Sequence, residues 1–103
     1  MIKVTFTEEG NKLSLRLEGH AGYAEIGKDI VCASATILAY TLASIVETHG
    51  IDTTIKLESG DIAIVCICTD HPMMDVIRDA YNYAIVGYTL LAQNYPQYVR
   101  LVP

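Results

Sequence analysis

Hydrophobic and polar positions alternate in the first part of the chain. Residues Ile2–Phe6 and Leu13–Glu18 alternate with a period of two, and the segment between them contains the turn signal Gly10-Asn11. Period-two alternation on both sides of a turn dipeptide is typical of a β-hairpin. The sequence therefore predicts that the chain begins with two antiparallel strands.

A long uncharged segment follows a glycine-containing connection. No charged residue occurs from Ile30 to Val46, Asp29 stands at a helix N-cap position, and Gly50 suits the first position after a helix. We predict a helix from Ile30 to about His49. A helix that is apolar nearly all round is normally buried on most sides, which indicates a core helix or a helix shared with a second subunit.

The second half of the chain repeats this order. Thr53–Glu58 and Asp61–Cys68 flank the turn signal Ser59-Gly60 and predict a second hairpin. The run Ile62–Cys68 is continuously apolar, which is typical of a strand covered on both faces.

A second helix is predicted from Pro72 to about Asn94, with Asp70 or His71 as its cap and Gly87 at a close packing contact. Tyr95-Pro96 ends this helix, and Tyr98–Val102 predicts a short last strand. The resulting order ββ-α-ββ-α-β favours an α+β fold, a two-layer sandwich with a mostly antiparallel sheet and two long helices, in a single domain of residues 1–103.

Composition and charge narrow the class of function. The formal net charge is −5 and 51% of residues are hydrophobic. An acidic chain without a basic patch is not expected to bind nucleic acid directly, although it would attract a basic peptide or protein. The alternating start lacks the pattern of a signal peptide, and neither uncharged run, at residues 30–46 or 80–99, predicts a membrane span. Three cysteines cannot pair evenly, so we expect a cytoplasmic protein with reduced thiols.

Cys32 and His20 carry the candidate chemistry. With Asp29 as N-cap, Cys32 is the third helical residue, where free N–H groups and the helix dipole favour thiolate over thiol. The backbone N–H groups of Cys32 and Ala33 are candidates to hold an oxyanion, and His20 is a candidate general base. Taken alone, the two residues leave open that Cys32 is a small core residue and His20 a surface side chain.

The surrounding residues resemble a known family signature. The motif consists of Gly19-His20-Ala21 followed by Gly27-Lys28-Asp29-Ile30-Val31-Cys32-Ala33. It is similar to the Gly-His and Gly-x-Asp-Ile-Val-Cys-Ala pattern of the ribosomal-processing cysteine protease family, Prp, and the similarity extends over nearly the whole chain. The resemblance implies a homodimeric bacterial endopeptidase, without cofactor or metal, that removes an N-terminal extension from large-subunit ribosomal protein number twenty-seven.

The same resemblance assigns roles to individual residues. It implies Cys32 as the nucleophile and His20 as the general base, with Gly19 at a further motif position. The connection containing Gly22 and Gly27 would be a substrate-gated lid that aligns the pair on closing, so that the two side chains can lie apart without substrate. Thr36 stands where the family commonly has serine, which keeps the hydroxyl and adds a methyl group.

Asp29 has two possible roles at this point. As an N-cap it stabilises the helix, and as a third catalytic residue it would orient His20.

Three other hypotheses remain beside the protease. Cys66, Cys68 and His71, with His49, are a conceivable zinc set, although cysteines two apart on a strand more often simply pack. A non-catalytic binding or assembly factor for a basic ribosomal protein tail is compatible with the acidic charge. A thiol redox sensor is the third, and it lacks an obvious resolving cysteine.

Overall fold

Seven secondary-structure elements follow one another in the predicted order. The structure is a computed structural model that describes residues 1–102, without the side chain of His71. The elements are β1 (Ile2–Glu9), β2 (Lys12–Glu18), α1 (Ile30–Thr48), β3 (Asp52–Glu58), β4 (Asp61–Ile67), α2 (His71–Asn94) and β5 (Val99–Val102). The α+β fold predicted from the sequence is confirmed.

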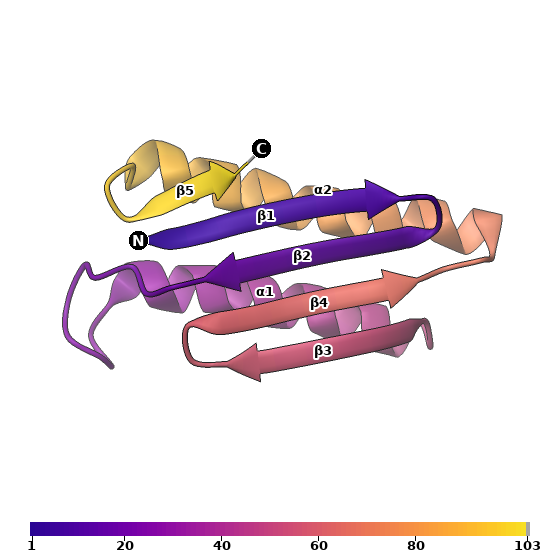
Figure 1. The fold of residues 1–103 in the computed structure, drawn as a ribbon, viewed down its shortest axis with the longest axis horizontal. Coiled ribbons are helices and arrows are strands. Elements are labelled where there is room, and N and C mark those ends of the chain that lie inside the picture. The colour runs from indigo at the N-terminus through magenta and orange to yellow at the C-terminus, as the bar shows by residue number, and fades with distance from the viewer. Residues whose placement is uncertain (103) are drawn as a thin grey trace.

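One sheet and one helical layer make up the molecule. The strand order is β3-β4-β2-β1-β5, and only the β1–β5 pair is parallel. Figure 1 shows both helices behind the sheet, so that they cover the same face. The core therefore lies between this face and the helices, where the side chains of Val4, Leu15 and Ile64 are almost completely buried.

The continuous apolar run of β4 is covered on one face only, so the prediction of two covered faces is wrong. Ile62 and Ile64 point into the core, whereas Ala63 is half-buried and Ile67 is exposed on the open face. Within residues 1–102 no helix covers this face (Figure 1). Ala63 lies between Arg16 of β2 and Lys56 of β3 in the strand register, where long aliphatic stems shield small side chains from water.

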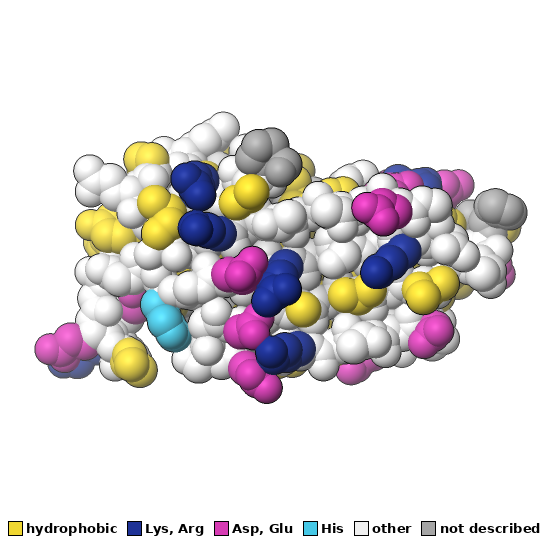
Figure 2. Space-filling view, viewed as in Figure 1, with side chains coloured by type: hydrophobic (Ala, Val, Ile, Leu, Met, Phe, Trp, Pro, Cys, Tyr) yellow, Lys and Arg dark blue, Asp and Glu magenta, His cyan; other side chains and the backbone are white. Residues whose placement is uncertain are grey.

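The open face of the sheet carries charges of both signs. Figure 2 shows basic and acidic side chains next to each other over the strands. Arg16 and Lys56 both lie within ion-pair distance of Asp61, at 3.5 and 2.6 Å. The side chains of Arg16 and Lys56 are about half exposed, at 52% and 46%, so these ion pairs contribute little to the free energy of unfolding.

Helix α1 lies against the sheet and α2. By length and composition alone it would pass for a membrane span, since its most apolar window has a mean hydropathy of 1.7. Its buried residues recur at helical spacing, including Val31, Ala35, Ala39 and Val46, and they belong to the core cluster. We therefore interpret α1 as a core helix that buries one face, which is one of the two alternatives that the sequence leaves open.

The two helices approach closely at Gly87, as predicted. A Cβ atom at this position would lie 2.8 Å from the Leu38 side chain. Beside this contact, the Tyr88 hydroxyl donates a hydrogen bond of 2.9 Å to the Ala35 carbonyl of α1. Burial raises the pKa of Tyr88, so the hydroxyl remains protonated and able to donate.

Replacing Tyr88 with phenylalanine is expected to lower the free energy of unfolding by about 1 kcal/mol, because one buried hydrogen bond is lost. Urea denaturation measures the change. Tyr40→Phe is the matched control, since Tyr40 is 44% exposed on the neighbouring helix α1. Equal stability of the Tyr88 variant and wild type would contradict this account of the helix contact.

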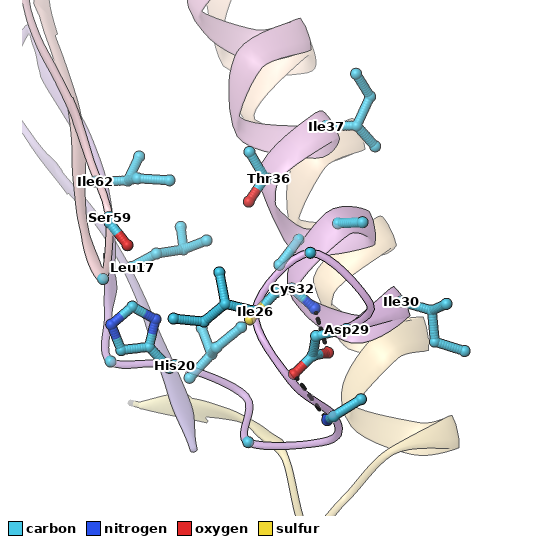
Figure 3. A pocket seen from close by; sticks show the side chains of 18 of the residues that line it. Leu17, His20, Ile26, Asp29, Ile30, Cys32, Thr36, Ile37, Ser59 and Ile62 are labelled. Carbon is cyan, nitrogen blue, oxygen red and sulfur yellow. Dashed lines mark hydrogen bonds between the residues drawn. The ribbon is translucent and has the colours of Figure 1, made fainter.

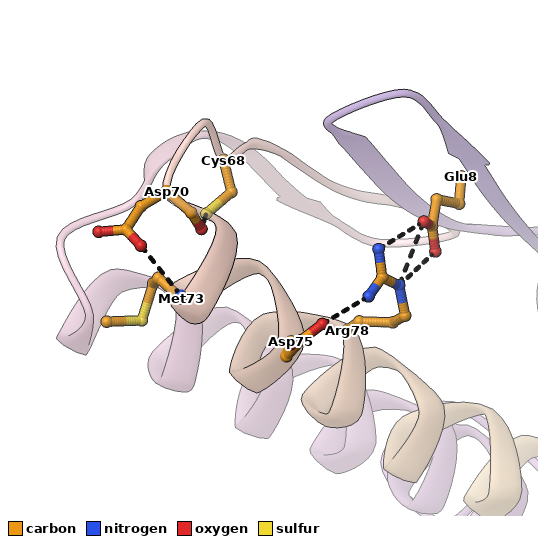
Figure 4. A network of polar contacts seen from close by, with 6 residues as sticks. All are labelled: Glu8, Cys68, Asp70, Met73, Asp75 and Arg78. Atoms are coloured by element: carbon orange, nitrogen blue, oxygen red, sulfur yellow. Dashed lines mark hydrogen bonds and ion pairs between the residues drawn. The ribbon is translucent and has the colours of Figure 1, made fainter.

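The start of α2 is held by the cap and by an ion pair to the first hairpin. Asp70 is the N-cap and accepts a hydrogen bond of 3.2 Å from the backbone N–H of Met73. About two turns later Arg78 forms an ion pair of 2.9 Å with Glu8 of β1 and also contacts Asp75 (Figure 4). These contacts hold the end of the sheet that is remote from Cys32.

Candidate active site

A cavity of about 1010 Å³ lies at the N-terminal end of α1. The loop between β2 and α1, the first turns of α1 and the β3–β4 turn enclose it. Its lining includes Gly19, His20, Asp29, Cys32, Thr36 and Gly60. The fold thus brings the predicted site residues of the loop and the helix to one place.

Cys32 is the third residue of α1, as predicted from the cap. Its side chain is half-buried and is a free thiol. The sulfur is on the side of the helix that faces the cavity (Figure 3). The backbone N–H of Ala21 donates a hydrogen bond of 3.4 Å to it.

His20 follows β2 and lies across the cavity from α1. Its ring packs over Gly60 of the β3–β4 turn, where a Cβ atom would lie 2.7 Å from Nε2. In Figure 3 the ring lies beside this turn, and the Ile26 side chain lies between it and Cys32. Among the described residues no hydrogen bond joins His20 to Cys32. Catalytic hydrogen bonds are often long or poorly aligned without substrate.

Asp29 joins the loop to the helix through both carboxylate oxygens. Oδ1 accepts from the backbone N–H groups of Val31 and Cys32 at 3.0 and 2.9 Å, and Oδ2 accepts from those of Tyr23 and Ala24 at 2.9 and 3.2 Å. Burial alone would raise the pKa of Asp29, but the four hydrogen bonds together lower it below its ordinary value. The N-cap prediction is confirmed, and no hydrogen bond from His20 reaches this carboxylate within the described part of the chain.

Asp29 also accepts hydrogen bonds from the backbone N–H groups of Cys32 and Ala33, which were the predicted oxyanion donors. The N–H of Cys32 donates to its carboxylate, and the N–H of Ala33 donates to its backbone carbonyl at 3.0 Å. Both donors are therefore already used within the helix cap. These two N–H groups are therefore not free to hold an oxyanion in this structure, in contrast to the expectation from the sequence.

Replacing Asp29 with asparagine is expected to separate its two functions. The amide oxygen still caps α1, whereas the amide NH₂ cannot accept from Tyr23 and Ala24. We expect faster hydrogen exchange at these two amides and a loss of about 1 kcal/mol in the free energy of unfolding. Asp70→Asn is the control, because Asp70 caps α2 through one oxygen only. Unchanged exchange at Tyr23 and Ala24 would contradict the role given to Oδ2.

The lowered pKa of Asp29 also predicts a pH dependence. Because the folded state favours the carboxylate, its contribution to stability is complete at neutral pH. It is lost as the pH falls below about 4, the ordinary range of an aspartate, toward the lower folded-state value. Thermal unfolding between pH 7 and 3 should show a smaller loss of stability in Asp29→Asn than in wild type.

The loop between β2 and α1 consists of a fixed part and an open part. Tyr23 packs edge-to-face on Tyr95 and Tyr98, with ring centroids 5.6 and 5.2 Å apart. Beyond it, Ile26 is 97% exposed and lies over the cavity between His20 and Cys32 in Figure 3. Residues 25–28 are therefore the open part of the loop, and Tyr23 belongs to its fixed part.

Glycines allow the turns of this loop. Gly22 and Gly27 have φ angles of 72° and 87°, in the left-handed region that favours glycine. At Gly19, a Cβ atom would collide with the carbonyl of Met1. The three predicted loop and motif glycines thus have steric reasons to be glycine.

Thr36 lies one turn after Cys32, and Figure 3 shows its hydroxyl on the cavity side of α1. A polar role beside the nucleophile therefore remains open to it.

Sequence reasoning missed the β3–β4 turn. Leu57, Ser59 and Gly60 line the cavity opposite Cys32, and Gly60 supports the His20 ring. The turn lies 40 residues after His20 in the sequence, and its Ser59-Gly60 signal indicates only a turn. The pairing of β2 with β4 brings it to the site, and this pairing was not predicted.

The cysteines of the alternative zinc and redox hypotheses lie away from this cavity. Cys66 and Cys68 are both buried, and burial raises the pKa of the Cys66 thiol. Among the described residues no three His, Cys, Asp or Glu side chains are grouped as metal ligands. The side chain of His71, which belonged to the zinc hypothesis, lies outside the described residues.

Comparisons with known proteins give a family and similar solved structures. The model of the family "Cysteine protease Prp" matches residues 1–100. None of the curated protein sequences matches. Among solved structures, an essential ribosomal processing protease Prp from S. aureus with a covalently linked product peptide has 24% identity and a TM-score of 0.82, covering 98% of this chain and 97% of that one.

Two further solved structures are similar. SMU.848 from Streptococcus mutans shares 27% identity with a TM-score of 0.71, covering 98% of this chain and 91% of that one. S. aureus Prp in complex with a substrate peptide shares 22% identity with a TM-score of 0.76, covering 99% of this chain and 98% of that one. These likenesses extend over the whole domain.

Proposed function

Because the chain belongs to the cysteine protease Prp family, we propose that it removes the N-terminal extension of a large-subunit ribosomal protein, number twenty-seven. The observation that supports this most is the cavity in which Cys32, at the helix N-terminus, faces His20. The S. aureus relatives are a ribosomal processing protease with product and substrate peptides. A cavity open to solvent over residues 25–28 suits an extended peptide.

The proposed mechanism uses these two side chains in turn. His20 takes the proton of the Cys32 thiol, and the thiolate attacks the carbonyl carbon of the scissile bond. When the tetrahedral intermediate collapses, the C–N bond breaks and His20 returns the proton to the leaving amine. Water, deprotonated by His20, then hydrolyses the thioester and restores the thiol.

Alignment of His20 is a separate step in this mechanism. The ring lies over Gly60 in the structure without substrate. Because Ala21 is held in the core cluster, rotation of the His20 side chain would bring the ring toward the sulfur when residues 25–28 close over a peptide. Binding of the correct peptide would then be coupled to assembly of the catalytic pair.

The substrate is tested with the precursor of the ribosomal protein. Incubation with the wild-type protein should yield one new N-terminus, identified by mass spectrometry. A precursor that already lacks its extension is the control and should remain intact. No cleavage of the precursor, with the precursor still bound, would favour a binding or assembly factor instead.

A homodimer is the second part of the proposal. Tyr83, Val86 and Leu90 are exposed on one face of α2 at helical spacing, and Leu90 shares a groove with Ile37 of α1. An exposed apolar surface of this kind is typical of protein interfaces. Sedimentation should give a dimer for wild type and a monomer for Val86→Lys. Ile67→Lys, on the open face of the sheet, is the control and should remain dimeric.

A cytoplasmic location completes the proposal. Cys32, Cys66 and Cys68 are all free thiols, which suits a reducing compartment. Fractionation of cells that express the protein tests this point, and recovery with membranes would count against it.

A further inference from the structure

The proposed reaction passes through negative charge on the sulfur and then on the carbonyl oxygen, and donors must hold that charge. Three of the donors at the helix N-terminus are used here. The Asp29 side chain accepts hydrogen bonds from the N–H groups of Val31 and Cys32, and the Asp29 carbonyl accepts one from the N–H of Ala33. A donor to the sulfur therefore does not come from these three amides.

One backbone donor reaches the sulfur directly. The N–H of Ala21 lies 3.4 Å from Cys32 Sγ. This distance is within the normal range for a hydrogen bond to sulfur. Ala21 follows His20 immediately, so the same dipeptide carries the general base and the donor.

The position of this N–H is fixed by the local fold. The Ala21 side chain is buried in the core cluster. Gly19 and Gly22, which flank the dipeptide, have φ angles of 96° and 72°, so the chain turns sharply on both sides. The contacts of Tyr23 with Asp29 and with Tyr95 hold the next residues of the loop. The amide is therefore positioned before any substrate binds.

We propose that the backbone N–H of Ala21 is a catalytic donor that stabilises the Cys32 thiolate. A hydrogen bond to a charged acceptor is stronger than one to a neutral acceptor, so this donor favours the thiolate over the thiol. The inference rests on the proposed function in treating Cys32 as a nucleophile. Ionisation of Cys32 is, however, measurable without any peptide substrate.

The test replaces the amide itself. Full-length protein is assembled by ligation at Cys32 from a synthetic segment of residues 1–31 and a recombinant segment of residues 32–103. L-lactic acid at position 21 changes the amide to an ester and removes only the N–H. The matched control has L-lactic acid at position 24, because the Ala24 N–H donates to Asp29 at 3.2 Å and not to the sulfur.

The measurement is the rate of Cys32 alkylation by iodoacetamide as a function of pH. With the ester at position 21 we expect the alkylation rate at neutral pH to be about tenfold lower. This is the fold-change expected from the loss of one hydrogen bond to a charged group. The rates should converge at high pH, where the thiol is ionised in every form. The ester at position 24 should follow the all-amide protein.

Two outcomes would overturn the inference. Equal alkylation in the all-amide protein and the position-21 ester would show that the N–H does not stabilise the thiolate. Equal slowing by both esters would show a general effect of loop disturbance. If the position-21 ester alone slows alkylation while the all-amide protein cuts no peptide, the inference holds and the proposed function fails.

Discussion

Replacing Cys32 with alanine is expected to reduce peptide cleavage by at least about 10⁴-fold, because removal of a nucleophile leaves only the catalysis of binding and positioning. Binding of the peptide should remain, since the cavity is lined mostly by other residues. Cleavage is measured by chromatography of the peptide products, and binding by fluorescence anisotropy of the labelled peptide.

Two controls show whether the Cys32→Ala variant is folded and lacks only the reactive thiol. Alanine is a good helix former and Cys32 is only half-buried, so the thermal midpoint should change little. Alkylation should be lost in the variant under native conditions, because Cys66 and Cys68 are buried. Cleavage that persists in Cys32→Ala would assign the nucleophile to another residue.

Replacing His20 with glutamine is expected to slow cleavage by about 10²- to 10⁴-fold, the usual contribution of a general acid–base. The effect should be on kcat more than on KM, because His20 acts on the proton and not on substrate affinity. His49→Gln is the matched control. Its ring lies at the end of α1, where Nδ1 contacts the Ile45 carbonyl at 2.8 Å.

The contrary result for this variant is a kcat as high as that of His49→Gln, which would exclude His20 as the general base.

Local sequence signals predicted the elements of this fold well. Asp29 and Asp70 are the N-caps of the two helices, as their side-chain chemistry suggests. Gly50 follows α1 with a φ of 65°. These features depend on a few neighbouring residues, so the sequence alone contains the information.

Tertiary features were less predictable. The apolar run of β4 does not reveal that both helices lie on one side of the sheet, which leaves Ala63 and Ile67 on the open face. The parallel pairing of β5 with β1 joins segments about a hundred residues apart. Such features depend on how the whole chain packs, which periodicity does not encode.

The candidate active site likewise has local features that the sequence predicts and tertiary features that it does not. The positions of Cys32 and of the Asp29 cap follow from the helix start. The Oδ2 contacts of Asp29 with the loop and the packing of His20 on Gly60 do not, since they depend on how the loop returns and on the β2–β4 pairing. The donor at Ala21 was missed for the same reason, because a backbone N–H has no signature in the sequence.

The most direct test of the central claim, that Cys32 attacks a peptide bound in this cavity, is to map the residue that a reactive peptide labels. A peptide with the sequence of the ribosomal extension and a C-terminal chloromethyl ketone is incubated with wild-type protein, and tandem mass spectrometry locates the adduct. The account predicts one adduct per chain at Cys32, formed together with loss of cleavage. An adduct at Cys66 or Cys68, or continued cleavage by protein fully labelled at Cys32, would contradict it.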